Sequence, residues 1–428
     1  MTDAQLLARR DRALGAGAQL FYETPLHLVR GEGVTVFDNH GRAYVDMYNN
    51  VPCVGHGHPR VAEAMARQQA TLNTHNRYLH EGIIAFAERL TALHAAPALE
   101  SVVFTCSGTE AVEVALRMAR FATGKRGVIA TNATYHGSNE LVGGLTRTGD
   151  GQPANPDLRT IPFPETYRPL AAGASEAELA DAHLTRLAEA IASLEACGAG
   201  LAALIICTIF ANEGLPNVPA GFMALAAKAV REAGGLVIAD EVQAGYGRTG
   251  RWWGYDLGGF TPDIVVTGKP MGAGLPLAAA TASRAVVEGF RAQTRYFNTF
   301  ASSPLQAAVG MAVLDVIEEE GLVENANAVG TGLKAALAAR ADAAPFIGEV
   351  RGAGLFIGIE MVVDRASKTP DRARAVAVVN RLKDKCFLTS NAGLHGNVVK
   401  IRPPLVFSQA NAEAFLSAWD ETIAELHG

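Results

Sequence analysis

The sequence lacks three features that would mark other classes of protein: a basic face, a long apolar run and a leader segment. Charged residues make up only 19% of the 428 residues, and the formal net charge is −6, which argues against a nucleic-acid binder. No stretch of about twenty apolar residues occurs, so no membrane span is expected. The first residues lack the apolar core of a signal peptide. We therefore expect a cytoplasmic protein with small-molecule partners, bound to neither nucleic acid nor membrane.

Cysteine is scarce as well, and its few copies follow no pattern. Five cysteines are scattered without a CxxC pair: Cys53, Cys106, Cys197, Cys207 and Cys386. An odd number without regular spacing favours free thiols in a reducing compartment, and no metal site is expected. In contrast, 49% of the residues are hydrophobic, and 428 residues exceed the size at which a single core stops growing. These values are typical of a well-packed enzyme with two lobes.

The chain is organised around residues 235–276. Two short apolar runs, at 236–239 and 264–266, are rich in β-branched residues and bounded by Gly, Asp or Pro, which predicts buried strands. The first run ends at Asp240, and Lys269 follows the second. Because ligands bind at the carboxyl ends of strands in open α/β sheets, this acid and this amine are expected over one pocket.

Such a pairing suggests pyridoxal phosphate. A lysine amine can hold the aldehyde of this cofactor as a Schiff base, and an aspartate can keep its pyridine nitrogen protonated. Taken alone, Lys269 could equally be a solvated loop residue and Asp240 a turn former. The glycines around Lys269 favour the cofactor, because they let a flat ligand approach the backbone closely: Gly268, Gly272 and Gly274.

Two further segments follow predicted strands. Ser107, Gly108 and Thr109 precede a helical pattern, where unpaired N–H groups and the helix dipole favour a phosphate, although the same residues suit an ordinary N-cap. Tyr135 follows the next strand and could stack on a pyridine ring or belong to the core. Gln243 lies near Asp240 and could donate to the phenolic oxygen of the ring.

Strands and helices alternate from about residue 100, which predicts an α/β domain with a mostly parallel sheet flanked by helices. Residues 151–175 are rich in Pro and Gly and are expected to form a surface excursion. The expected domains are 51–305, which binds the cofactor, and a smaller α+β domain formed by 1–50 and 306–428. The predicted strands are a hairpin at 33–46 and runs at 102–104, 128–130, 204–206, 236–239, 264–266, 278–282, 355–361 and 398–401. The predicted helices lie near the N-terminus and at 61–72, 81–93, 110–123, 219–234, 305–320, 323–341 and 410–426.

Together these segments resemble the class III (ω-amino acid) aminotransferases, which are pyridoxal-phosphate enzymes of fold type I. The likeness extends over essentially the whole chain and implies a seven-stranded sheet and a homodimer with its sites at the subunit interface. The matching motifs are SGTEAVEVALRMAR (107–120), YHG (135–137), IADEVQAGYGRTG (238–250), TGKPMGAGLP (267–276), FNTFASSP (297–304) and VKIRPPL (399–405).

The resemblance implies roles at the cofactor ring. Lys269 would carry the Schiff base and shuttle protons, and Asp240 would pair with the pyridine nitrogen. Tyr135 and Val242 would lie on the two faces of the ring, while Gln243 would contact its phenolic oxygen.

Further roles implied by the resemblance concern the phosphate and the substrate. The three residues from Ser107 to Thr109 would hold the cofactor phosphate, and His136 would belong to the same site. Thr299 would reach the cofactor of the partner subunit. Arg402 would bind a substrate carboxylate, for which a bidentate guanidinium is suited, unless it forms only a surface ion pair.

The activity implied is transfer of an amino group from a primary amine or ω-amino acid to a keto acid such as pyruvate. One departure concerns the glutamate that many relatives place at the end of the strand at 204–206, where it pairs with the mobile arginine. Cys207 occupies that position here, and Glu213 lies further on. This departure argues against 2-oxoglutarate as the keto acid that Arg402 binds.

An alternative activity is suggested by segments that resemble the phospho-lyases of the same family, including Asn76 to His80 and Lys400 to Arg402. Such enzymes eliminate phosphate from O-phosphoethanolamine or a similar amine. Arg402 and Arg77 would then bind the substrate phosphate, with Tyr78 beside them. A silent cofactor-binding protein and a Rossmann dehydrogenase are the two remaining alternatives, but no GxGxxG motif opens the first βα unit.

Overall fold

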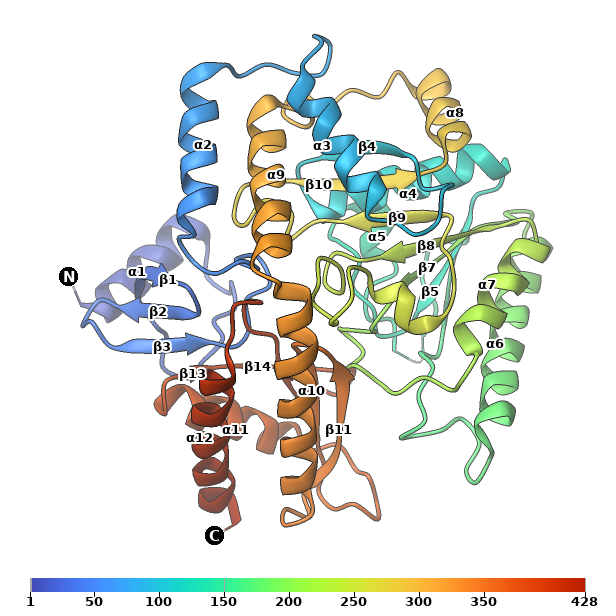
Figure 1. Cartoon of the computed structure of the whole chain (residues 1–428). Helices are drawn as coiled ribbons and strands as arrows, with labels where there is room; N and C mark the ends of the chain where they lie inside the picture. The colour runs from blue at the N-terminus through green and yellow to red at the C-terminus, as the bar shows by residue number, and fades with distance from the viewer. Residues whose placement is uncertain (1, 150, 428) are drawn as a thin grey trace.

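The computed structural model describes residues 2–149 and 151–427, which form three sheets surrounded by helices (Figure 1). The largest sheet has seven strands in the order β4-β10-β9-β8-β7-β5-β6. Strand β10 runs antiparallel to both of its neighbours, whereas β9, β8, β7, β5 and β6 pair in parallel. The expected α/β class with a mostly parallel seven-stranded sheet is thus confirmed.

The strands of this sheet alternate with the helices that cover it. Its strands are β4 (Ser101–Thr105), β5 (Gly127–Thr131), β6 (Leu158–Ile161), β7 (Leu201–Cys207), β8 (Leu236–Asp240), β9 (Ile264–Thr267) and β10 (Ala278–Ala282). The helices between them are α4 (Gly108–Thr123), α5 (Glu140–Gly143), α6 (Glu176–Ala196) and α7 (Phe222–Glu232), with a short 3₁₀ turn at Gly254–Gly258 and α8 (Arg284–Thr294) after β10.

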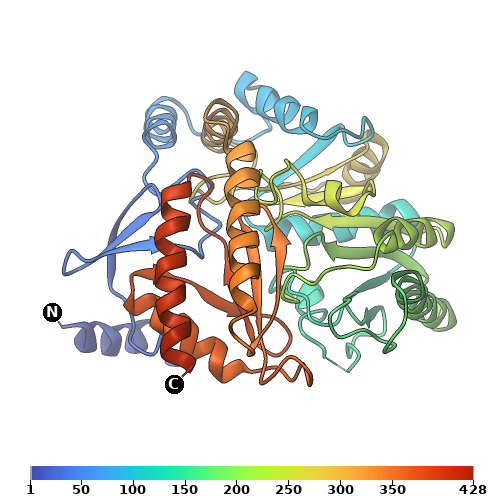
Figure 2. The ribbon, with the colours of Figure 1, turned by 60° about the horizontal axis from the view of Figure 1, so that its bottom comes forward.

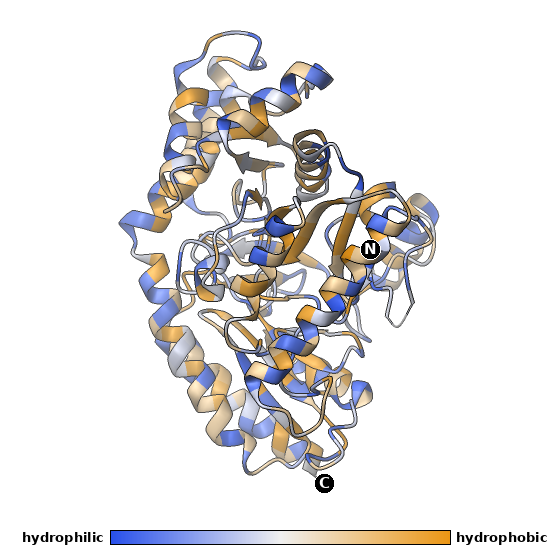
Figure 3. Cartoon of the chain, turned by 90° about the vertical axis from the view of Figure 1, so that its right-hand side faces the viewer, coloured by the Kyte–Doolittle hydropathy of each residue, from blue (hydrophilic) through white to orange (hydrophobic). Residues whose placement is uncertain are grey.

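Both faces of the seven-stranded sheet are buried, which explains its nearly continuous apolar runs. On one face Ile205 and Ile238 pack with α4, and on the other Leu204 and Val237 belong to the core that includes α6 and α7. The helices can be seen on either side of the sheet in Figure 2. Figure 3 shows the hydrophobic residues gathered on the strands and on the inward faces of the helices.

The parallel strands bring their carboxyl ends to one edge of the sheet. Asp240 is the last residue of β8, and Lys269 lies two residues after the end of β9. Strands β8 and β9 are neighbours, with Asp240 opposite Val266. The acid and the amine singled out from the sequence therefore lie at the same edge.

Two smaller sheets combine both ends of the chain. One has the order β1-β2-β3-β13, with the predicted hairpin forming β2 and β3 and the C-terminal β13 pairing in parallel with β3. The other has the order β11-β12-β15-β14. The domain boundaries at residues 50 and 305 stay a prediction. The strands are β1 (Leu28–Glu32), β2 (Thr35–Asp38), β3 (Ala43–Asp46), β11 (Ile347–Ala353), β12 (Phe356–Met361), β13 (Phe387–Leu388), β14 (Ser390–Ala392) and β15 (Val398–Ile401).

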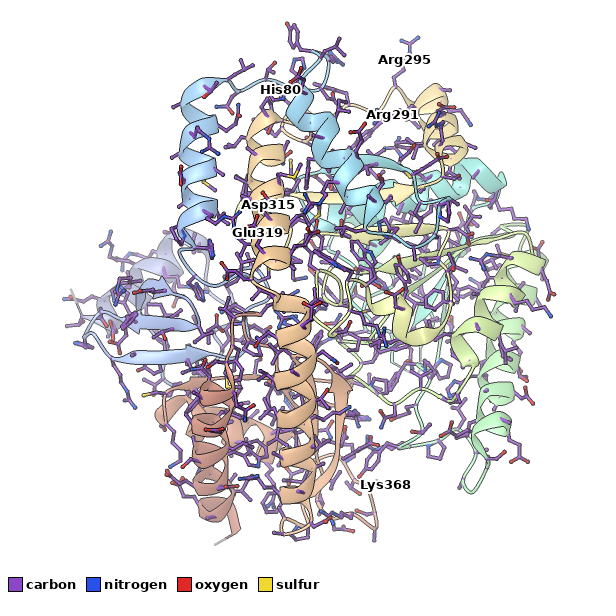
Figure 4. The ribbon with its side chains drawn as sticks, viewed as in Figure 1. His80, Arg291, Arg295, Asp315, Glu319 and Lys368 are labelled. Atoms are coloured by element: carbon purple, nitrogen blue, oxygen red, sulfur yellow. The ribbon has the colours of Figure 1, made fainter. Side chains whose placement is uncertain are left out.

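The remaining helices lie at the two ends of the chain and along one side of the molecule. They are α1 (Asp3–Leu14), α2 (Pro59–Thr71), α3 (Glu81–Ala92), α9 (Pro304–Glu319), α10 (Leu322–Ala341), α11 (Arg372–Asp384) and α12 (Gln409–His427). Helix α9 is tied to α2 by the ion pair of Arg60 with Glu319 at 2.7 Å, and to α3 by Arg89 with Asp315 at 3.5 Å (Figure 4). None of the described helices combines the length and apolarity needed to cross a bilayer.

One expectation about the fold is wrong. Residues 151–175 do not all form a surface excursion, because Leu158–Ile161 is strand β6 and closes one edge of the large sheet. Leu158 and Ile161 are buried. The Pro- and Gly-rich flanks hide this short run, since only its two apolar ends carry a signal and an arginine lies between them.

Candidate active site

A cavity of about 130 Å³ opens at the carboxyl edge of the large sheet. Its walls come from the segments that follow β4, β5, β8 and β9, so strands far apart in sequence contribute to one space. Nine of the residues predicted to bind the cofactor line it, together with Gly137. They are Ser107, Gly108, Thr109, Tyr135, His136, Asp240, Val242, Gln243 and Lys269.

The N-terminus of α4 forms one wall of this cavity. Ser107 is the N-cap of the helix, and its hydroxyl oxygen accepts a hydrogen bond from Glu110 N at 3.2 Å, while Glu110 Oε2 accepts one from Cys106 N at 2.8 Å. The N-cap interpretation of Ser107 is therefore correct, and it does not compete with an anion site. The first N–H groups of a helix have no intrahelical partner, and here they belong to residues that line the cavity.

Two glycines allow the start of α4 to pack closely against the neighbouring segments. A Cβ at Gly108 would lie 3.2 Å from both Cγ atoms of Val242. At Gly137, which has a φ of +143°, a Cβ would lie 2.8 Å from Thr109 Oγ1. Side chains at these positions would push the loops into the cavity, so glycine preserves the space between α4 and Val242.

Asp240 is held by a chain of polar contacts behind the cavity. Its Oδ2 lies 2.6 Å from His136 Nδ1, and its Oδ1 accepts a hydrogen bond from Val242 N at 3.0 Å. The other ring nitrogen of His136 lies 2.8 Å from Thr134 Oγ1. His136 donates to the carboxylate through Nδ1 and accepts from the threonine hydroxyl through Nε2, which fixes the carboxylate while leaving it free to accept one more hydrogen bond from the cavity.

Lys269 projects from the turn after β9 into the same cavity. Its side chain is open to the cavity, yet the dense surrounding protein desolvates the ammonium and lowers its pKa. Arg402 lowers the pKa further, whereas Asp240 opposes this shift. A lysine whose pKa is lowered in this way is a better nucleophile towards a carbonyl group near neutral pH.

Lys400 of β15 and Arg402, the residue directly after this strand, lie beside the cavity and on the same side of the chain, because alternate residues of an extended segment point to the same side. Arg402 donates through Nε to Tyr48 O at 3.0 Å and through Nη1 to Gln243 Oε1. The Lys400 ammonium lies 5.9 Å from the centre of the Tyr48 ring and 6.0 Å from that of Phe356. Burial, then Arg402 and Lys269, lower the pKa of Lys400 well below 10.5.

Neither of these two buried cations has a carboxylate partner within the described parts of the chain. Glu213, which follows Cys207 by six residues, is buried near His136 and Cys207, but its carboxylate accepts a hydrogen bond from Thr131 Oγ1 and forms no ion pair with either cation. Cys207 ends β7 with a thiol whose burial raises its pKa. Arg402 therefore has no glutamate partner among the described residues, and its role as a mobile arginine stays a prediction.

Four of the predicted site residues do not line this cavity: Arg402 lies beside it, and Thr299, Arg77 and Tyr78 lie elsewhere. Thr299 lines a separate cavity of about 660 Å³ together with His75. The guanidinium of Arg77 lies 3.8 Å from the centre of the Phe297 ring, and the ring of the exposed Tyr78 stacks on His75. These residues form a group of their own on the surface of the chain.

Other residues at the site were given no role from the sequence. Asn50 donates to Val242 O at 3.4 Å and Gln243 O at 3.3 Å, and its own oxygen accepts from Arg248 Nε at 2.9 Å. The sequence offers no signal for this bridge, because its partners lie about 190 positions away. Lys400 could have been found, since alternation on a strand places it beside Arg402.

The geometry fits pyridoxal 5′-phosphate. A helix N-terminus suits the phosphate, the carboxylate of Asp240 suits a protonated ring nitrogen, and Lys269 supplies an amine of lowered pKa. A glycine-lined gap separates α4 from Val242. Fold and site together define a pyridoxal-phosphate-dependent enzyme of fold type I.

The chain belongs to the class-III aminotransferase family, whose sequence model, Aminotransferase class-III, matches residues 18–423. It is 38% identical to an alanine--glyoxylate aminotransferase 2-like protein of Drosophila melanogaster, over 99% of this chain and 87% of that protein. It is 32% identical to ethanolamine-phosphate phospho-lyase homolog 1 of Caenorhabditis elegans, over 98% of this chain and 93% of that one.

The similar solved structures also include both a phospholyase and a transaminase. A phospholyase from Arthrobacter, in complex with phosphoethanolamine, superposes with a TM-score of 0.94 at 38% identity, covering 98% of this chain and 99% of that one. A thermostable (S)-enantioselective ω-transaminase from Thermomicrobium roseum superposes with a TM-score of 0.89 at 28% identity, covering 100% of each chain. The family and the cofactor follow from these comparisons.

Proposed function

We propose that this protein is a pyridoxal-phosphate-dependent phospho-lyase that removes phosphate from a phosphorylated primary amine. The observation that carries the proposal is the pair of buried cations, Lys400 and Arg402, beside Lys269 and without a carboxylate partner in the described chain. Unpaired buried charge is costly, so the pair is suited to an anion that arrives with the substrate. A phosphate dianion neutralises two cations, whereas a carboxylate neutralises one.

Each polar residue around the cavity has a part in this reaction. When bound, the cofactor withdraws electrons from the substrate carbon that bears the amine. Asp240, oriented by His136, keeps the ring nitrogen protonated. Lys269 takes the proton from that carbon, and the bond from the neighbouring carbon to the phosphate oxygen breaks. Lys400 and Arg402 hold the departing phosphate through charge-assisted hydrogen bonds.

The residues that line the cavity would hold the cofactor. Ser107, Gly108 and Thr109 would bind its phosphate at the start of α4, and Tyr135 and Val242 would lie on the two faces of its ring. In a homodimer, Thr299 would reach the cofactor phosphate of the second subunit from the surface group that also holds Arg77 and Tyr78. A cytoplasmic location stays a prediction.

Transamination is the second candidate, and it was the first choice from the sequence. It uses the same Lys269 and Asp240, and the planar guanidinium of Arg402 can bind a keto-acid carboxylate in a bidentate manner. Relatives named as aminotransferases and transaminases support it. We rank transamination second to elimination because Arg402 has no glutamate partner among the described residues and because Lys400 adds a second cation.

The two candidates are separated by incubating the holoenzyme with O-phosphoethanolamine and no keto acid. Elimination is expected to release inorganic phosphate, ammonia and acetaldehyde in equal amounts, and Lys269→Ala should release none. A parallel incubation of a primary amine with pyruvate tests for alanine. Alanine formation without any phosphate release from O-phosphoethanolamine would refute the phospho-lyase proposal and select transamination.

A further inference from the structure

A third cavity, also of about 660 Å³ and here called the outer cavity, is distinct from the one lined by Thr299. Its lining comes from the segment before β1, from the loop after α5, from the first turn of α11 and from the hairpin between β14 and β15. No aspartate or glutamate lines it. The polar residues that do so include Tyr48, Arg147, Arg372, Asn391 and His395.

Two arginines give this outer cavity its charge. Arg147 and Arg372 are exposed and form no ion pair or side-chain hydrogen bond within the described residues. Other exposed arginines of this chain pair with a carboxylate, as Arg126 does with Asp157 at 3.0 Å. The lining of the outer cavity offers these two arginines no such carboxylate.

The outer cavity adjoins the buried cations. Tyr48 lines it and also lies 5.1 Å from the Arg402 guanidinium, measured to the ring centre. Ser390 lines it and pairs with Lys400 in the register of β14 and β15. Arg147 is close enough to help lower the pKa of Lys400, after burial and after Arg402 and Lys269.

A series of cationic side chains therefore extends from the surface to Lys269. Arg147 and Arg372 stand at the rim, Lys400 and Arg402 lie beneath Tyr48, and Arg402 contacts Gln243, which lines the inner cavity with Lys269. A concave surface lined by charges of one sign concentrates its field and raises the association rate of oppositely charged ligands.

We propose that the outer cavity is a second anion-binding site, in which Arg147 and Arg372 capture the phosphate group of the incoming substrate before it reaches Lys400 and Arg402. The ligand class is a phosphate monoester dianion on a small amine. This inference rests on the proposed phospho-lyase function for its substrate, but the cavity can be tested with inorganic phosphate alone.

The test compares the Arg147→Gln/Arg372→Gln double variant with wild-type holoenzyme. For O-phosphoethanolamine at low ionic strength, kcat/KM should fall about tenfold and kcat should change less than about twofold, because the chemistry at Lys269 is intact. The decline of kcat/KM with added salt should become shallower. Calorimetric titration with inorganic phosphate should show affinity weakened by about tenfold in the same variant.

Two controls make the test specific. Arg147→Lys/Arg372→Lys keeps the charge and should retain the wild-type salt dependence. Arg186→Gln/Lys228→Gln removes the same number of charges from exposed positions on α6 and α7. This variant should change neither the salt dependence of kcat/KM nor the affinity for inorganic phosphate.

Unchanged phosphate affinity together with an unchanged salt dependence in Arg147→Gln/Arg372→Gln would overturn the inference. A loss confined to kcat would overturn it as well, because capture precedes the chemical step. If wild-type enzyme releases no phosphate from O-phosphoethanolamine, the proposed function fails, and the phosphate titration still decides for or against the outer cavity.

Discussion

The C-terminal sheet carries two sets of buried charges that are organised in opposite ways. On β11 and β12, Arg351 and Glu360 form a 2.5 Å ion pair, and Glu360 also accepts from Arg168 and Asn397 at 2.5 Å each. Lys400 on β15 and Arg402 just after it have aromatic rings and neutral oxygens around them, and neither forms an ion pair with a carboxylate of residues 2–149 or 151–427.

The pKa directions show what this difference means. Burial alone would raise the pKa of Glu360, but Arg351 and Arg168 hold it below the ordinary value. Burial lowers the pKa of Lys400, and Arg402 lowers it further. The first set is paired within the fold, whereas under the proposed function the second is completed by the phosphate of the substrate. Breaking the first set should therefore affect stability, and breaking the second should affect activity.

The largest expected effect is at Lys269, which lies beside the cations Lys400 and Arg402. Lys269→Ala should lower turnover of any amine substrate by about a thousandfold or more, because it removes both the covalent attachment and the proton carrier. The midpoint of thermal unfolding, measured by circular dichroism without cofactor, should remain close to that of the wild type. Turnover within tenfold of the wild type would exclude the assignment of Lys269.

At the paired set on β11 and β12, Glu360→Gln should lower the free energy of unfolding by about 3 kcal/mol, because the buried Arg351 loses one of its two carboxylate partners and the partly exposed Arg168 loses its ion pair. Denaturant unfolding measures this, and kcat of the folded holoenzyme should stay within a few-fold of the wild type. Glu189→Gln, in an exposed pair on α6, is the matched control and should cost less than about 1 kcal/mol. A stable Glu360→Gln enzyme with lost activity would reverse the roles given to the two sets.

A smaller effect on catalysis is expected at Lys400. Lys400→Met should reduce kcat/KM for O-phosphoethanolamine by about tenfold to a hundredfold, because one charge-assisted hydrogen bond to the phosphate is lost. An amine without phosphate should be affected less than about threefold in a transamination half-reaction followed by absorbance. Equal losses for both substrates would assign Lys400 to structure. Lys228→Met on α7 serves as the surface control.

The smallest effect is a pH dependence of stability that belongs to Lys400. Since burial, Arg402 and Lys269 lower its folded pKa well below 10.5, the unfolded chain binds more protons between the lowered pKa and 10.5. This lysine therefore destabilises the fold at neutral pH, and the penalty fades as pH rises. The unfolding free energy of Lys400→Met minus that of the wild type should be larger by at least about 1 kcal/mol at pH 7 than near pH 10. A pH-independent difference would show that Lys400 is not desolvated.

Local sequence was sufficient to predict the segments at the inner cavity. The runs at β8 and β9 are short, β-branched and bounded by turn residues, so their ends, Asp240 and Lys269, could be placed at one edge of a sheet. Ser107 was predicted as a cap or an anion site, and it caps α4 while lining the cavity. Such signals depend only on neighbouring residues, which is why they could be read without the fold.

Contacts across the chain could not be predicted in this way. His136 and Asp240 lie 104 positions apart, and Asn50 and Val242 lie 192 apart, so no local pattern relates them. Strands β13 and β14 have only two and three residues, too few for any periodicity. The absence of a carboxylate near Lys400 is likewise a property of the packed structure.

The parallel pairing of β13 with β3 has a consequence for biosynthesis. Val45 and Asp46 pair with Phe387 and Leu388, so strand β3 gains this partner only after the 341 positions from Asp46 to Phe387 (387 − 46) have been synthesised. At about 5–20 residues per second, the edge of β3 waits for roughly 20–70 s without its partner. During translation that bare edge is a template for other nascent chains, and early chaperone binding would protect it.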